Sequence, residues 1–339
     1  ILVGAASGDA LTSGARNVAI GTNTLGAATT ATMNVAIGQS AMEGVASGVA
    51  LEGAIGIGKD ALTAINSTGA NYTIGIGYWA GKAITSGAGN LAIGYEAMKT
   101  HTTGARNMAI GYGAMNDTDA GSNSLGSYDN IFIGYDAGGG TWADVNNIQN
   151  VAIGNYAMSS ALNTANNSVA IGHYALSAVT TADSSIAVGK EALMSVTTGD
   201  ANIGIGQHAM HVHTTGGNNI AIGRYAMDDT DAGSNSLGST DNIFIGVSAG
   251  GGTWADAVSQ MNVAIGNYAL DAALNATNYN VAIGHESMTD MTAGVENVAV
   301  GRRTMFEATT ADYTVTIGAS AGYNITTGNN NTLVGYQAG

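Results

Sequence analysis

The sequence predicts an all-β protein, a parallel β-solenoid, and three observations lead to that fold class. A Gly preceded by Ile or Val recurs at a nearly constant spacing, short runs of alternating apolar residues precede it, and the composition is extreme. The chain of 339 residues has 51 Gly, no Pro, no Cys and 10% charged residues against 45% hydrophobic ones. That composition is typical neither of an ordinary globular domain nor of a disordered chain, so something regular is expected.

The recurring Gly defines a repeat of 17 residues with insertions of one to six. A single such unit cannot bury its apolar residues, but stacked units form a continuous core. We therefore predict about nineteen rungs over residues 1–339 as one continuous β-solenoid, interpreted as a segment of a longer fibre. The nineteen positions are Gly4, Gly21, Gly38, Gly58, Gly77, Gly94, Gly111, Gly134, Gly154, Gly172, Gly189, Gly206, Gly223, Gly246, Gly266, Gly284, Gly301, Gly318 and Gly335.

Each rung is predicted to contain two short strands and two turns. In residues 90–106, Leu91 and Ile93 alternate with Ala92, and alternation of period two is typical of a strand. We expect the Val and Ile positions to face the core and the Ala position to face outward, so an Asp at Ile153 is expected to destabilise the core. The Gly that follows is expected to form a corner, and the Ala97-Met98 pair to supply the second strand.

Asn recurs four residues before the corner Gly in most rungs, which predicts a ladder of hydrogen-bonded amides with a structural role. A longer period overlies the first. Residues 117–126 recur letter for letter at residues 229–238, and the rung spacings repeat after 112 residues. Residues 94–205 and 206–317 are therefore interpreted as duplicated blocks of six rungs.

Composition excludes several classes of partner. With a formal charge of −15 and nine Lys and Arg spread thinly along the chain, no basic stripe is available for a phosphate backbone, so we expect no nucleic acid partner. No run of about 18 apolar residues exists, so we expect no membrane insertion. The absence of Cys excludes disulfides and thiolate metal sites.

The unit in residues 90–106 resembles the repeats of bacteriophage tail-fibre proteins, over essentially the whole chain. Its core in residues 167–172, Asn-Ser-Val-Ala-Ile-Gly, is similar to the head repeat of trimeric autotransporter adhesins. The resemblance implies a β-roll wound into a homotrimer and a role in attachment to host surfaces. Because adhesin heads commonly use a shorter coil, the spacing of 17 favours the phage group.

These resemblances imply a structural shaft or host-attachment module of a tail fibre, located in the virion. The alternative is the head of a bacterial adhesin on the extracellular side of the cell surface, and a polysaccharide-degrading phage spike is the third hypothesis. The expected partners are the chain itself, as a parallel homotrimer, and a host cell-surface glycan or receptor. We expect the outward Ala face to form the trimer interface, since small side chains let backbones approach closely. Ala19, Ala92 and Ala264 belong to this stripe.

Two loops carry candidate calcium ligands, because closely spaced Asp and Asn oxygens beside a Gly suit Ca²⁺. The alternative is a solvated loop, since no bidentate Glu follows. These candidate ligands are Asp117, Asp119, Asn123, Asp229, Asp231 and Asn235. Apart from possible Ca²⁺, no cofactor is expected.

Aromatic and imidazole side chains give two more candidates. Trp142 and Trp254 lie on Gly-rich insertions, where a large ring either packs against a neighbouring rung or contacts a ligand. His208, His211 and His213 cluster in one rung and are interpreted as surface histidines, of which the last two are expected to share a strand face.

No catalytic residue is predicted, and we expect the chain not to be an enzyme. Glycine pairs such as Gly204 and Gly206 are rung corners, not the start of a helix that could bind a phosphate.

Overall fold

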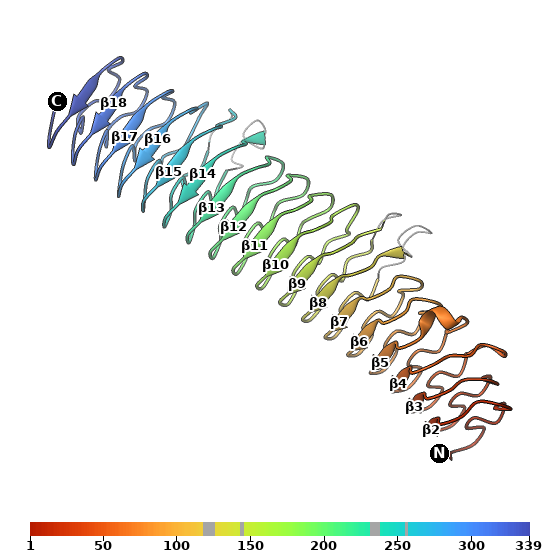
Figure 1. Cartoon of the computed structure of the whole chain (residues 1–339). Helices are drawn as coiled ribbons and strands as arrows, with labels where there is room; N and C mark the ends of the chain where they lie inside the picture. Colours follow the sequence, from red (N-terminus) through yellow and green to blue (C-terminus); the bar gives the residue numbers. More distant parts are fainter. Residues whose placement is uncertain (118–125, 143–145, 231–237, 255–256) are drawn as a thin grey trace. The chain divides into compact units, whose positions relative to one another are not determined.

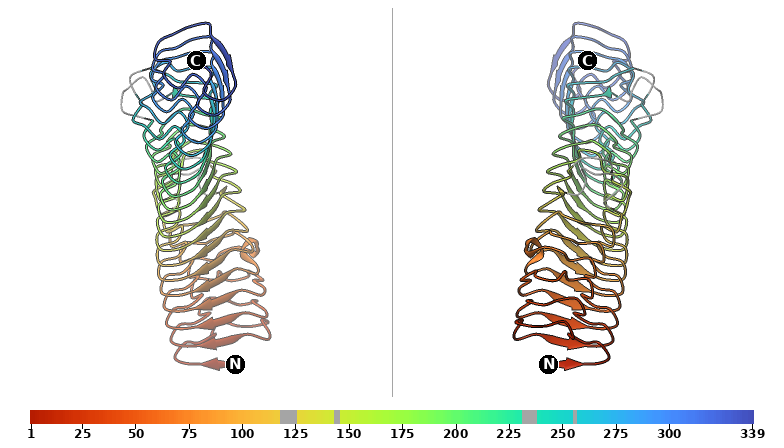
Figure 2. Two further views of the ribbon diagram at one scale, coloured as in Figure 1. Left: turned by 90° about the vertical axis from the view of Figure 1, so that its left-hand side faces the viewer. Right: turned by 90° about the vertical axis from the view of Figure 1, so that its right-hand side faces the viewer.

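The computed structural model describes residues 1–117, 126–142, 146–230, 238–254 and 257–339. The chain divides into two units, Ile1–Ser168 and Val169–Gly339. In each unit the described strands run parallel and each pairs with the next along the chain, so that successive coils stack (Figures 1 and 2). Each unit is therefore a parallel β-solenoid of repeats of about 17 residues, which confirms the predicted all-β fold class.

Unit 1 contains nine described strands and one short 3-10 helix, η1 (Thr68–Ala70). Residue partners repeat in register, as where Ala19 pairs with Ala36 between β2 and β3. The strands are β1 (Leu2–Val3), β2 (Val18–Ile20), β3 (Val35–Ile37), β4 (Ile55–Ile57), β5 (Ile74–Ile76), β6 (Leu91–Ile93), β7 (Met108–Ile110), β8 (Ile131–Ile133) and β9 (Val151–Ile153).

Unit 2 contains ten described strands in the same arrangement. Between β15 and β16, for example, Val263 pairs with Val281 and Ala264 with Ala282. The strands are β10 (Val169–Ile171), β11 (Ile186–Val188), β12 (Ile203–Ile205), β13 (Ile220–Ile222), β14 (Ile243–Ile245), β15 (Val263–Ile265), β16 (Val281–Ile283), β17 (Val298–Val300), β18 (Val315–Ile317) and β19 (Thr332–Val334).

The recurring Gly ends each strand at a corner that only glycine can form. Gly284 has φ +139°, and a Cβ placed on it would lie 2.4 Å from the carbonyl oxygen of Gly301 in the next rung. The backbone therefore needs both the positive φ and the close approach of its neighbour, as the sequence predicted.

The prediction for the two faces of the strand was wrong. The central residue of each strand is the buried one: Ala92, Ala152 and Ala264 have no exposed surface, whereas Ile153 is 39% exposed. The Val and Ile positions face outward, so an interface formed by the Ala stripe is excluded. An Asp at Ile153 would replace a partly exposed side chain, not a core residue.

The physical reason is the narrow width of the coil. The central residue of a strand faces the residue four positions after the corner Gly, and the two share one small volume. Ala92 is accompanied by the buried Met98, whereas Phe132 is accompanied by Gly138, whose Cβ would lie 2.5 Å from the Phe ring. A large side chain at one position therefore requires a small one at the other.

The predicted second strand is absent from the described residues of the rungs. The segment around Ala97-Met98 is a turn, in which Glu96 has φ +58° and Met98 has φ +51°. Hydrogen bonds between rungs persist through it, from the Glu96 N–H to the Tyr78 carbonyl and from the Met98 N–H to the Ala114 carbonyl. Alternating left-handed residues thus bend the chain while keeping the ladder of backbone hydrogen bonds.

The predicted asparagine ladder is confirmed. The side-chain oxygen of Asn242 accepts the backbone N–H of Asn262 at 3.0 Å and its side-chain amide at 3.1 Å. Asn262 in turn presents its own oxygen to Asn280 in the next rung. These amides are buried, so each satisfies polar groups that would otherwise lack partners in the core.

Candidate functional sites

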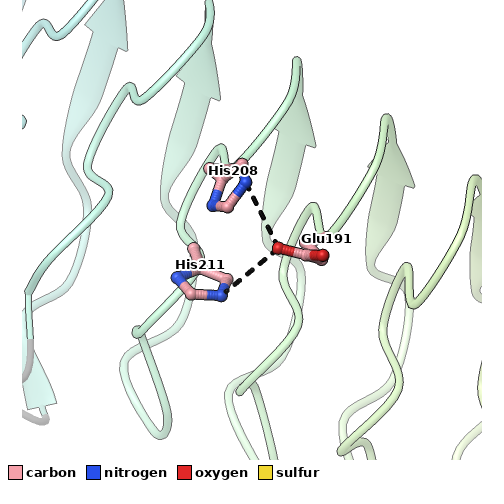
Figure 3. Close-up of side chains that lie close together, drawn as sticks. All are labelled: Glu191, His208 and His211. Carbon is pink, nitrogen blue, oxygen red and sulfur yellow. Dashed lines mark ion pairs between the residues drawn. The ribbon is translucent and has the colours of Figure 1, made fainter.

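Two histidines and a glutamate from adjacent rungs of unit 2 lie together on the turn side of the coil (Figure 3). Glu191 is two residues after the corner Gly189, and His208 is two residues after the corner Gly206. They occupy the same position in successive rungs, which lie about 4.8 Å apart in a stacked sheet. His211 follows one turn later, and one ligand atom from each of the three residues lies within 4.8 Å of the others.

A single carboxylate oxygen faces both imidazoles. Oε2 of Glu191 lies 3.2 Å from Nε2 of His208 and 3.8 Å from Nε2 of His211. The side chains keep 17%, 19% and 24% exposure for Glu191, His208 and His211. The cluster is thus largely enclosed by neighbouring side chains but remains open to solvent on one side.

Charged neighbours surround the cluster on two sides. Lys190 Nζ lies 3.1 Å from the other Glu191 oxygen, Oε1. Asp228 Oδ1 lies 3.7 Å from Nδ1 of His211, is inaccessible to solvent and accepts no hydrogen bond. Burial raises the pKa of the Glu191 carboxyl, but the Lys190 hydrogen bond and the nearby positive charges outweigh burial and hold that pKa below its ordinary value.

The corresponding place one block earlier in the sequence, 112 residues back, contains a different group. Trp79, Glu96 and Lys99 stand where Glu191, His208 and His211 stand in the second block. There Lys99 pairs with Glu96 at 3.3 Å and lies 4.7 Å from the Trp79 ring centre. The His-His-Glu group is therefore a local departure from the repeat. Comparing equivalent positions of successive rungs, which brings Glu191 next to His208, is the signal by which sequence reasoning would have found it.

His213 is not part of this cluster, so the surface interpretation was wrong for it. Its side chain is fully buried, with Nε2 at 2.8 Å from the Gly216 carbonyl oxygen and Nδ1 at 2.9 Å from Thr230 Oγ1. His211 and His213 lie in the turn region and not on one strand, so alternation does not apply to them. His101 is buried in the same way in unit 1.

These buried histidines predict a loss of stability in mild acid. Burial lowers the pKa of His101 to about 4 and also lowers the pKa of His213. Free imidazole titrates near 6.5, so the folded state resists a proton that the unfolded chain accepts. Stability is expected to be constant above pH 6.5 and to fall below it, by on the order of 3 kcal/mol for His101 as the pH approaches 4.

The measurement is urea denaturation between pH 7 and pH 4.5 on the wild type and on the double variant His101→Val, His213→Val. Other rungs have an apolar residue at this position, such as the buried Val196, so Val fits. The double variant should lose less stability on acidification. His285→Val, at a side chain 48% exposed, is the control and should behave like the wild type. Equal acid sensitivity of the wild type and the double variant would contradict the assignment.

Trp142 and Trp254 are fully buried, which matches the packing alternative. Each indole N–H donates to a glycine carbonyl of its own insertion, at 3.1 Å to Gly138 and 3.0 Å to Gly250. Each ring also packs at 5.7 Å against the Phe at the centre of the preceding strand. Rings without exposed surface are not placed to contact a ligand in the single chain.

The two calcium loops are described only in part. Asp119, Asn123, Asp231 and Asn235 lie outside the described residues. A side-chain oxygen of Asp117 accepts the hydroxyl of Thr141, and that of Asp229 accepts the hydroxyl of Thr253 at 2.7 Å. The described carboxylates thus hydrogen-bond to the next insertion, and calcium binding stays a prediction.

An apolar stripe runs along the outer face of the strands in each unit. In unit 2, every outward position of β10 to β18 is Val or Ile, and those at 37% exposure or more are Ile171, Ile205, Ile265, Ile283 and Ile317. A strand face that meets water normally has polar side chains. The stripe is therefore a candidate interface.

Tyrosines form a second exposed row in unit 1. The rings of Tyr78, Tyr95, Tyr112 and Tyr135 stack on one another at 4.8 to 5.4 Å. Because their faces cover one another, mainly ring edges are left for contact with a sugar.

Comparison with protein-family models gave no match, and no curated protein matched the chain. Among the described residues, none of the helices has the length and hydropathy to cross a membrane.

Proposed function

We propose that this chain is a structural shaft and host-attachment segment of a bacteriophage tail fibre, in which three copies associate as a parallel homotrimer. The observation that carries the proposal is the Val and Ile stripe, which repeats on almost every rung and has no cover within the chain. Exposed apolar patches of more than a few hundred Å² mark association surfaces. Identical rungs of a second and third copy offer the same stripe at the same spacing, which suits a closed symmetric interface.

The head of a bacterial trimeric autotransporter adhesin is the second candidate function. The segment that favours it is Asn-Ser-Val-Ala-Ile-Gly in residues 167–172, which is similar to the repeat of that family. The same stripe would serve as the interface in both cases. The two candidates differ in location, the virion or the bacterial cell surface, and both place a repetitive rigid module between an attachment point and a host surface.

Native mass spectrometry of the whole chain tests the homotrimer. We expect a species of three times the chain mass of 33.7 kDa. The triple variant Ile205→Asp, Ile265→Asp, Ile283→Asp places charges on the stripe and should give a folded monomer, because a charge at a dry interface lacks a partner. The matched control is Tyr279→Asp, at a side chain 50% exposed on another part of the rung, and it should stay trimeric. A wild-type chain that remains a folded monomer at high concentration would refute the homotrimer.

A separate assay addresses the remaining hypothesis of a polysaccharide-degrading spike. The purified chain is incubated with bacterial surface polysaccharides, and binding and the release of reducing ends are measured. Binding without cleavage supports an attachment role. Release of reducing ends in proportion to the amount of chain would overturn the proposal of a non-enzymatic segment.

A further inference from the structure

The His-His-Glu cluster of unit 2 has the donor set and the spacing of a transition-metal site. Zn²⁺ binds imidazole nitrogen and carboxylate oxygen at about 2.0–2.1 Å, so two ligand atoms of a tetrahedral site lie about 3.3 Å apart. The separations from Glu191 Oε2 are 3.2 Å to His208 and 3.8 Å to His211. We propose that Glu191, His208 and His211 bind a Zn²⁺ ion that links two adjacent rungs.

The surroundings of the cluster suit this role. A metal-bound imidazole usually donates its second N–H to a carboxylate, which fixes the tautomer and the ring orientation. Asp228 Oδ1 lies 3.7 Å from Nδ1 of His211 on the side away from Glu191 and accepts no hydrogen bond. Asp228 is thus the positioning residue of the site. It leaves Nε2 of His211 for the ion.

The coordination is incomplete in protein ligands. Three side chains bind the ion, and the fourth position opens toward solvent, where the ligands keep 17% to 24% exposure. Lys190 pairs with Glu191 Oε1 and leaves Oε2 directed at the imidazoles. A water molecule or a side chain from another copy of the chain completes the tetrahedron.

The duplicated block argues that the cluster is not a requirement of the fold. At the equivalent positions, Trp79, Glu96 and Lys99 form a different group on the same backbone. In a repeat protein a specific site must depart from the repeat, because a feature of every rung marks no single place. The departure at this rung brings together two imidazoles and a carboxylate.

Isothermal titration of the whole chain with ZnCl₂, after treatment with EDTA and dialysis, tests the proposal. We expect one high-affinity ion per chain. Glu191→Gln, which keeps the shape of the side chain, should weaken binding at least tenfold. The double variant His208→Glu, His211→Lys should abolish the high-affinity site, and it introduces the residues that the first block holds at these positions. His285→Gln, beside the acidic Glu286, is the control and should bind Zn²⁺ like the wild type.

Co²⁺ provides a second readout that reports the ligands themselves. CoCl₂ should give the intense visible bands of four-coordinate cobalt in the wild type and none in the double variant. Asp228→Asn should keep the band positions but weaken affinity by about 10–100-fold, as expected of a positioning residue. Absence of Zn²⁺ binding, or binding that the cluster variants leave unchanged while circular dichroism shows them folded, would overturn the proposal. Neither result bears on the homotrimer, because all ligands come from one chain.

Discussion

Gly284→Ala is expected to destabilise unit 2 by roughly 2–6 kcal/mol, because a disfavoured backbone conformation and an overpacked contact each cost about 1–3 kcal/mol. The residue has φ +139°, and a Cβ would meet the Gly301 carbonyl oxygen at 2.4 Å and its carbon at 2.6 Å. Both atoms belong to the backbone of the next rung, so no side-chain rotation relieves the clash.

The measurement is urea denaturation followed by circular dichroism. Gly26→Ala is the matched control, since the nearest atom to its Cβ would lie at an ordinary contact distance of 3.5 Å. The control should keep the midpoint of the wild type or raise it slightly. Equal midpoints for Gly284→Ala and the wild type would show that the corner does not need glycine.

Ala264→Asp is expected to destabilise the same unit by at least about 3 kcal/mol, because it places an uncompensated charge in a dry core. Ala264 is at the centre of β15 and has no exposed surface. Its neighbour Ile265 is 38% exposed, so Ile265→Asp is the control in a single chain and should leave the fold intact.

Both variants are compared in the monomeric background of Ile205→Asp, Ile283→Asp, so that loss of assembly does not obscure loss of folding. Circular dichroism and urea midpoints report the outcome. If Ile265→Asp unfolded the chain while Ala264→Asp did not, the assignment of inner and outer faces would be reversed.

The spacing of glycines was sufficient to predict the parallel solenoid, because a corner with positive φ must recur once in every rung. The direction of the faces was not predictable from alternation. In Val-Ala-Ile both faces are apolar, so period two separates the residues without saying which set is buried. The size relation between Phe132 and Gly138, and between Ala92 and Met98, carries that information, but it becomes readable only once the turn is known to cross the core.

The candidate site was missed for a related reason. His211 and His213 were compared along the chain as if on a strand, whereas the turn separates them and buries His213. Contacts in a solenoid run mainly between rungs. Glu191 and His208 are 17 residues apart in sequence and 3.2 Å apart in space, and this relation follows from the repeat length alone.

The direction of the asparagine ladder has a consequence for synthesis. Asn262, Asn280 and Asn297 each donate toward the rung that precedes them in the chain and offer an acceptor to the rung that follows. A ribosome releases the earlier rung first, so each emerging segment meets an acceptor that is already in place. Most partners are about one repeat away, and chains dominated by such short-range contacts close small loops and fold rapidly. Within each unit, the last completed rung serves as the template for the next.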